Sequence, residues 1–171
     1  MFAGSKGMNN DIFLLLGSNQ GKPVDHLAAA AEKIEEDAGK ILARSSVYKT
    51  AAWGIREQPD FYNQVLQITS NYSPEVLLEK LLGIEQAIGR VRLQKWGPRI
   101  IDIDLLFYGQ EVRNTTSLQL PHPGIPQRKF TLLPLAEITP DLRHPVSKKS
   151  IATLLAECTD TLSVEKISST T

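Results

Sequence analysis

Residues 61–89, FYNQVLQITSNYSPEVLLEKLLGIEQAIG, contain a predicted strand followed directly by a predicted helix. Side chains of a strand alternate between its two faces. In this strand Phe61, Asn63, Val65 and Gln67 share one face, and Tyr62, Gln64, Leu66 and Ile68 share the other. Ser73 is a favoured N-cap, Pro74 suits the first helical position, and apolar residues then recur at helical spacing until Gly89. The segment predicts a domain that combines a sheet with helices.

Working outward from this segment, the pattern predicts further strands and one more helix. The strands are Asp11–Gly17, Ile41–Thr50 and Ile100–Tyr108, and the helix runs from Pro23 to a stop at Gly39. A turn is expected at 17–19. The resulting order, β-α-β-β-α-β, is ferredoxin-like: one antiparallel α+β sheet with both helices on one face.

A C-terminal extension follows the last of these strands. Leu118–Gly124 has no clear period and is expected to be irregular. Phe130–Ile138 is expected to be a helix that Pro134 kinks or divides, because proline lacks the N–H that the helix needs. Ile151–Glu157 is predicted as the last helix.

The chain of 171 residues suits one domain, which we place at 11–171, with 1–10 as a disordered or tag-like N-terminus. Its 19 basic and 19 acidic side chains cancel, which argues against a protein that coats nucleic acid or an acidic membrane. One cysteine, Cys158, fits a reducing cytoplasm. The apolar runs are too short to span a bilayer. We therefore expect a cytoplasmic protein that binds neither nucleic acid nor membrane, and we expect it to be a monomer.

The most informative chemical feature is the pair Asp102 and Asp104 inside an apolar strand. Alternation places both carboxylates on one face and directs Ile101, Ile103 and Leu105 into the core. Paired carboxylates are hard oxygen ligands, which suit a Mg²⁺ ion that shares its shell with substrate phosphates. Ion pairs with nearby arginines are the other interpretation of the same pair.

A basic segment leads directly into this strand. Arg90, Arg92, Lys95 and Arg99 lie within ten residues, with no acid among them. Arginine guanidinium groups match phosphate oxygens, although a solvated basic loop is also common. Cations beside a pair of carboxylates indicate phosphoryl or nucleotidyl transfer. No GxxxxGK[ST] pattern is present, so the P-loop enzymes are excluded.

Other side chains suit a flat, polar ligand or ordinary packing. His122, held between two prolines, can donate to a phosphate, but surface histidines are common. Trp53 and Trp96 lie in predicted loops, where aromatic rings often stack on planar ligands. Asn63 beside Phe61 offers an amide next to a ring.

Residues 89–109, GRVRLQKWGPRIIDIDLLFYG, resemble the signature of the hydroxymethyldihydropterin pyrophosphokinases. LLLGSNQG, SSVYKTAAWG, QPDFYNQVLQI and LPHPGIPQRKFTLLPLAEI also resemble blocks of that family, in family order, between Asp11 and Pro145. The resemblance implies a ferredoxin-like domain with added elements. It also implies a Mg²⁺-dependent enzyme of folate synthesis that transfers diphosphate from ATP to 6-hydroxymethyl-7,8-dihydropterin and releases AMP.

The resemblance also assigns roles to individual residues. Asp102 and Asp104 would hold two Mg²⁺ ions and act in catalysis with Arg90 and Arg99. The ATP side would be formed by Glu85, Arg92, Trp96, Leu105, His122 and Arg128. On the pterin side, Phe61 and Phe130 would sandwich the ring, with Thr50, Ala51, Trp53 and Asn63 around its edge. Many family members carry two prolines where this chain has Ala51-Ala52, and tyrosine where it has Phe61.

Three other functional classes fit parts of the pattern. A nucleotidyltransferase with paired carboxylates on a sheet would release pyrophosphate rather than AMP. An RNA-binding module would need exposed aromatic residues on its strands and a basic face. A catalytically inactive regulator would not need both the acids and the arginines to be intact.

Overall fold

The computed structural model describes residues 9–51, 59–89 and 100–167, which form an ordered succession of strands and helices. The first half contains β1 (Asn9–Ser18), α1 (Pro23–Asp37), β2 (Lys40–Arg44), β3 (Tyr48–Thr50), β4 (Phe61–Ser70) and α2 (Pro74–Ile88). The second half contains β5 (Asp102–Tyr108), β6 (Arg113–Asn114), β7 (Gln119–Leu120), a 3-10 turn (Ile125–Gln127), α3 (Lys129–Ile138), α4 (Ile151–Glu157) and β8 (Val164–Lys166).

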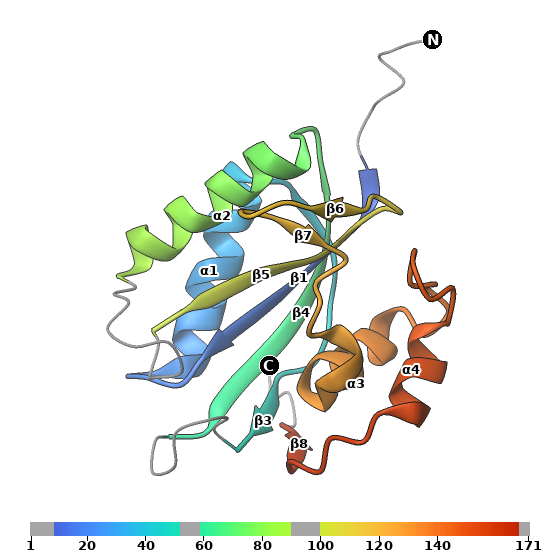
Figure 1. Cartoon of the computed structure of the whole chain (residues 1–171). Helices are drawn as coiled ribbons and strands as arrows, with labels where there is room; N and C mark the ends of the chain where they lie inside the picture. The colour runs from blue at the N-terminus through green and yellow to red at the C-terminus, as the bar shows by residue number, and fades with distance from the viewer. Residues whose placement is uncertain (1–8, 52–58, 90–99, 168–171) are drawn as a thin grey trace, which may run out of the picture.

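The main sheet has the order β5-β1-β4-β3-β8, and β2 pairs with β4 beside β3. Every pair in it is antiparallel. Short strands β6 and β7 form a separate hairpin next to β5 (Figure 1). The prediction of a mixed helical and antiparallel domain is confirmed.

Helices cover both faces of this sheet. Alternate β1 residues Ile12, Leu14 and Leu16 pack with α1 and α2 in one buried cluster. Phe13 and Leu15 point the other way and pack with α3 and α4 in a second cluster. Figure 1 shows the two helix pairs on opposite sides of the sheet. The sequence predicted α1 and α2 on one face but did not predict that the C-terminal extension covers the other.

The helix signals before and after α2 act as expected. Ser73 Oγ accepts a hydrogen bond from the Val76 N–H at 3.2 Å. Gly89 ends the helix with φ at 113°, a left-handed conformation that glycine adopts without a steric penalty. The strand predicted from Phe61 to Ser70 and the helix predicted from Ile151 to Glu157 are confirmed with these bounds.

Proline does not divide α3. The helix runs unbroken through Pro134, and Thr139 N–H still donates to Leu135 carbonyl at 2.7 Å beyond it. The missing proline N–H removes one bond of the ladder and leaves its neighbours in place. The expected division of the helix at this residue is therefore wrong, whereas a kink there stays a prediction.

The segment predicted as one strand, Ile41–Thr50, is two strands separated at Ser45–Val47. The Ser45 hydroxyl accepts a hydrogen bond from Val65 N–H at 2.9 Å, and a side-chain acceptor at that position interrupts the regular ladder. Two strand ends also differ. β1 continues through Gly17 and Ser18, where a turn was expected, and β5 begins at Asp102 rather than Ile100.

Residues 1–10 were predicted to be a disordered or tag-like N-terminus. Residues 1–8 lie outside the described residues, and β1 already begins at Asn9. Within the described ranges no helix combines the length and apolar character needed to cross a bilayer.

His144 makes the stability of the fold dependent on pH. Its ring is buried, and Nδ1 accepts hydrogen bonds from the N–H groups of Val146 and Ser147, both at 3.2 Å. Burial lowers the pKa of His144 below its ordinary value of 6.5. The unfolded chain therefore takes up the proton first as the pH falls, so the free energy of unfolding decreases below about pH 6.5.

We expect His144→Asn to weaken this pH dependence, because the asparagine oxygen accepts the same two hydrogen bonds without titrating. Urea denaturation at pH 7.5 and 5.0 measures the effect. The free energy of unfolding should fall less in the variant than in the wild type. Equal falls in both proteins would show that His144 does not carry the dependence.

Candidate active site

Three neighbouring strands bring the acid pair and Asn63 into one row. Asp102 of β5 lies opposite Gly17 of β1, and Gly17 lies opposite Asn63 of β4. Asp104 lies opposite Leu15. The predicted alternation is confirmed, since Ile101, Ile103 and Leu105 all enter the core on the other face. Both carboxylates thus lie on the face of the sheet that also carries Asn63.

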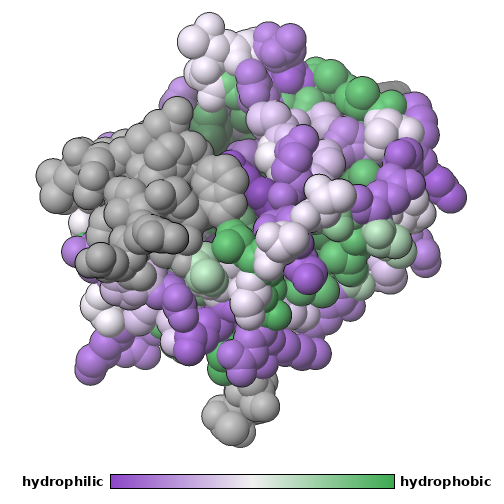
Figure 2. Space-filling model, turned by 60° about the horizontal axis from the view of Figure 1, so that its bottom comes forward, coloured by the Kyte–Doolittle hydropathy of each residue, from purple (hydrophilic) through white to green (hydrophobic). Residues whose placement is uncertain are grey.

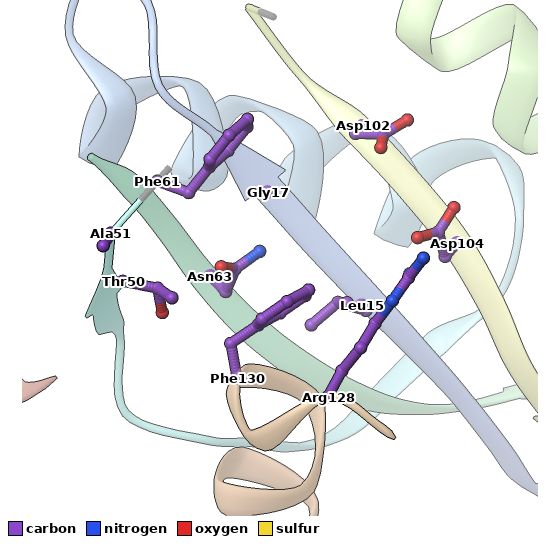
Figure 3. Close-up of a pocket in the computed structure, with 10 residues that line it drawn as sticks. All are labelled: Leu15, Gly17, Thr50, Ala51, Phe61, Asn63, Asp102, Asp104, Arg128 and Phe130. Atoms are coloured by element: carbon purple, nitrogen blue, oxygen red, sulfur yellow. The ribbon is translucent and has the colours of Figure 1, made fainter. Parts of the chain in front are cut away.

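A hollow opens on this face, with the acid pair at one side (Figure 3). Phe61 and Asn63 rise from the start of β4, and Thr50 and Ala51 come from the end of β3. Arg128 and Phe130 reach in from the start of α3. In Figure 3 the Arg128 side chain extends toward Asp104. The structure brings together five of the six residues predicted for the pterin side; the sixth, Trp53, lies outside the described residues.

Two buried polar atoms in this hollow have no hydrogen-bond partner among the described residues. They are Thr50 Oγ1 and Asn63 Oδ1, on residues that are 2% and 5% exposed. An unsatisfied buried polar atom costs about 1–3 kcal/mol, so such atoms mark places where a ligand can complete the bonding. The hollow therefore suits a ligand with hydrogen-bonding groups on its edge and a ring for Phe61 and Phe130.

Sequence reasoning did not single out Gly17, which faces this hollow. A Cβ placed on Gly17 would lie 2.6 Å from Asn63 Nδ2, well inside van der Waals contact. The same nitrogen donates to the Leu16 carbonyl at 3.3 Å, which sets the side chain's position. The available signal was a glycine inside a strand pattern, which often marks such a close approach.

The acid pair also borders a second hollow, between α2, β5 and β7, lined by Glu85, Leu105 and His122. All three were predicted for the ATP side. Glu85 is buried, and its Oε2 accepts a hydrogen bond from Ile103 N–H at 2.6 Å. This bond ties α2 to the strand that carries both aspartates. Further lining residues that were not predicted are Leu78, Leu82, Thr116, Ser117, Leu118, Gln119 and Pro123.

His122 is held as a neutral hydrogen-bond donor toward this second hollow. Burial, with a further contribution from Arg128, lowers the pKa of His122 to about 4, while Asp102 opposes that change. Its Nδ1 accepts from Gly124 N–H at 3.0 Å. The remaining proton of the neutral ring therefore lies on Nε2 and is available to an acceptor such as a phosphate oxygen.

The predicted site residues divide into two groups. In the first group, Asp102, Asp104 and the other described site residues line one or both hollows. Arg128 was predicted for the ATP side but lines the first hollow. Outside the described residues are Trp53, Arg90, Arg92, Trp96 and Arg99. Among the described residues no group of three or more His, Cys, Asp or Glu side chains is placed to hold a metal. Two carboxylates nevertheless fit Mg²⁺, which takes its remaining ligands from water and substrate phosphates.

The chain is similar to known proteins over most of its length. Residues 13–140 match the family model described as 7,8-dihydro-6-hydroxymethylpterin-pyrophosphokinase (HPPK). A Synechocystis protein named 2-amino-4-hydroxy-6-hydroxymethyldihydropteridine pyrophosphokinase is 44% identical over 147 residues, covering 84% of this chain and 75% of that protein. The Aquifex aeolicus protein of the same name is 41% identical, covering 82% of this chain and 87% of that one.

Some similar proteins are much longer. Folic acid synthesis protein fol1 of Pneumocystis carinii is 39% identical over 89% of this chain, which spans only 20% of fol1. The crystal structure of wild-type Plasmodium falciparum HPPK-DHPS with SDX-DHP shares the fold, with a TM-score of 0.69 at 18% identity. That match covers 85% of this chain and 43% of the solved one.

The match to the family model extends from β1 into the residues just after α3, and so includes every described residue of both hollows. Two relatives are more than 40% identical to this chain and are covered over most of their own length. These relatives and the match to the family model show that the chain belongs to the HPPK family.

Proposed function

We propose that the chain transfers the terminal diphosphate of ATP to the hydroxyl of 6-hydroxymethyl-7,8-dihydropterin and releases AMP. One observation carries the proposal: Asp102 and Asp104 line both hollows at once. An enzyme that joins two substrates needs its charge-handling groups where the two reacting ends meet. The family membership and the names of the relatives identify the two substrates.

The first hollow is proposed to hold the pterin. Phe61 and Phe130 offer ring faces to a flat heterocycle, and Thr50 Oγ1 and Asn63 Oδ1 offer unsatisfied polar atoms to its amino and amide edge. Adjacent strands lie about 4.8 Å apart, so Asn63 and Asp102 are separated by roughly 10 Å across Gly17. This gap is wide enough for the hydroxymethyl group to reach the acid pair.

The second hollow is proposed to hold the nucleotide, with His122 donating from Nε2 to a phosphate oxygen. Arg90, Arg92 and Arg99 are proposed to contact phosphates, and Trp96 to line the nucleotide side. Asp102 and Asp104 are proposed to hold two Mg²⁺ ions between the substrates. Bound Mg²⁺ would offset phosphate charge and make the attacking hydroxyl more acidic.

In the proposed reaction the pterin hydroxyl oxygen forms a bond to the β-phosphorus. The bond between that phosphorus and the oxygen bridging to the α-phosphorus breaks, and this oxygen leaves as part of AMP. The hydroxyl proton is released. The protein's contribution is to position the two reacting ends and to stabilise charge, and no side chain bonds covalently to substrate.

Product analysis tests the proposal. The purified chain is incubated with ATP, Mg²⁺ and 6-hydroxymethyl-7,8-dihydropterin, and the nucleotides are separated by chromatography. AMP should form only when the pterin is present, in a 1:1 ratio to the pterin consumed. Formation of ADP would indicate single-phosphate transfer, and release of free pyrophosphate would indicate a nucleotidyltransferase; either result contradicts the proposal.

Replacing His122 tests the nucleotide side separately. We expect His122→Ala to raise the KM for ATP about tenfold, corresponding to one lost hydrogen bond to a charged oxygen, roughly 1.4 kcal/mol. The KM for the pterin should stay within twofold, because His122 lines only the second hollow. Steady-state kinetics with each substrate varied in turn gives both values. An increase confined to the pterin KM would contradict this placement of ATP.

We further propose the ferredoxin-like arrangement within the mixed fold. We count β1 as the first strand, β2 and β3 together as the second, β4 as the third and β5 as the fourth. The order of these strands across the sheet is then 4-1-3-2, and α1 and α2 lie in the two crossover connections. A cytoplasmic, monomeric protein also remains our prediction.

A further inference from the structure

The segment Asp160–Lys166 lies beyond the part of the chain that matches the family model, which ends at residue 140. The sequence alone assigned it no role. In the structure it contacts two different walls of the first hollow, one on α3 and one on β3. We propose that Asp160–Lys166 positions these two walls and thereby sets the affinity for the pterin, an inference that rests on the proposed function of that hollow.

The first contact is at the start of α3. The first N–H groups of a helix have no partner inside the helix, and no side chain of the adjoining turn caps α3. Asp160 supplies the missing acceptor: its Oδ2 accepts from Lys129 N–H at 3.0 Å. Its other oxygen, Oδ1, accepts from Leu162 N–H at 2.9 Å, which orients the carboxylate. A negative charge at a helix N-terminus is also favourable to the helix dipole.

This contact matters to the site because of the residues beside Lys129. Arg128 and Phe130 flank it directly, and both line the first hollow. Arg128 also lies over the Phe130 ring, 5.8 Å from its centre. A start of α3 that frays would move both side chains, so the carboxylate of Asp160 holds them in place without touching the ligand.

The second contact is along β3. Val164, Glu165 and Lys166 of β8 lie opposite Thr50, Lys49 and Tyr48, and Ile167 N–H donates to Val47 carbonyl at 2.8 Å. β3 has only three residues, and β8 is its neighbour on the side away from β4. Thr50, which carries one of the unsatisfied polar atoms of the hollow, is therefore held between β4 and β8.

The two walls are also joined directly. Glu137 of α3 accepts hydrogen bonds from the Tyr48 hydroxyl at 2.8 Å and from the Ser46 N–H at 3.0 Å. Lys166 of β8 lies 4.0 Å from the same carboxylate. These contacts form a closed loop of connections. Glu137 joins α3 to β3, β3 pairs with β8, and Asp160, in the segment that contains β8, bonds back to the start of α3. Among the described residues, none of those that make these contacts lines the second hollow, which is built from α2, β5 and β7.

Two variants test the proposal, each disturbing one wall. Asp160→Ala removes the acceptor at α3, and Glu165→Pro removes an N–H from the pairing with β3. Titration calorimetry gives the Kd of the pterin and, in a separate titration, of ATP with Mg²⁺. We expect each variant to raise the pterin Kd about three- to tenfold, the range expected when a capped or paired segment becomes only partly populated. The ATP Kd should change less than the pterin Kd, because the segment contacts no described residue that lines the second hollow, although the charge of Arg128 also acts on His122.

Two comparisons separate positioning from simple loss of stability. Asp160→Asn keeps one uncharged oxygen acceptor and should recover part of the pterin affinity. Glu157→Ala removes an exposed ion pair to Lys149 in the same region and should bind both substrates like the wild type. Thermal melting confirms that each variant is folded at the temperature of the titrations.

The outcomes are distinct. Wild-type protein that fails to bind the pterin would contradict the proposed function before any variant is compared. If the wild type binds it, an unchanged pterin Kd in both variants would overturn the positioning role alone. Equal losses of pterin and ATP affinity would also overturn it, since they would indicate a general loss of structure.

Discussion

Asp104→Ala is expected to lower turnover by at least about a thousandfold, equivalent to roughly 4 kcal/mol of barrier, while the protein stays folded. The loss is large because one side chain serves both hollows: without it the proposed metal site keeps only Asp102. Folding should survive because the neighbouring Ile103 and Leu105, not Asp104, fill the core. Steady-state assays with saturating substrates measure the first effect, and thermal melting measures the second.

A matched control is Asp37→Ala, at the exposed end of α1, because Asp37 lines neither hollow. It removes the same charge and should turn over at the wild-type rate. If Asp104→Ala keeps its rate within about tenfold of the wild type, the metal assignment is wrong. If Asp104→Ala loses both its fold and its activity, Asp104→Asn becomes the decisive variant, because it preserves the side-chain shape. The turnover rate of Asp104→Asn should also fall at least about a hundredfold.

Gly17→Ala is expected to raise the KM for the pterin at least about tenfold, roughly 1.4 kcal/mol, with little change in the KM for ATP. The added methyl group would lie 2.6 Å from Asn63 Nδ2, so the amide must move away from the position in which it faces the hollow. Forcing an extra methyl group into a packed site costs about 1–3 kcal/mol, part of which should appear as lower stability.

Gly83→Ala is the control for this substitution. Gly83 lies inside α2, and a Cβ placed there has no atom within 4 Å. The change should leave both KM values unaltered and stabilise the helix by up to about 1 kcal/mol. A pterin KM that stays within twofold in Gly17→Ala would show that the gap between Asn63 and Asp102 is not where the substrate lies.

Elements with strong local signals were predictable from the sequence. The Ser73 cap and Gly89 stop of α2 act through bonds between near neighbours, and alternation along β4 needs only the pleat of the strand. The division between β2 and β3 was not predictable, because Ser45 interrupts the ladder by bonding to Val65, twenty residues away. β8 was missed for a similar reason: three residues carry no periodic pattern, and their pairing with β3 is a long-range contact.

The same distinction applies to the site. The side on which Asp102 and Asp104 lie follows from alternation alone, and the structure confirms it. The role of Gly17 as the residue between Asp102 and Asn63 depends on the register of three strands, which local patterns do not define. Residues around both hollows lie on elements that are distant in sequence. Their grouping came from the family resemblance. On the face that Figure 2 shows, hydrophilic and hydrophobic residues are interspersed.

The most direct test of diphosphate transfer at this site follows each phosphorus atom of ATP. The chain is incubated with the pterin, Mg²⁺ and ATP labelled separately at the α-, β- or γ-phosphorus, and the pterin product is isolated. We predict that the β and γ labels both move to the pterin, that the α label remains in AMP, and that Asp104→Ala abolishes the transfer. Transfer of the γ label without the β label, or of the α label, would contradict the account.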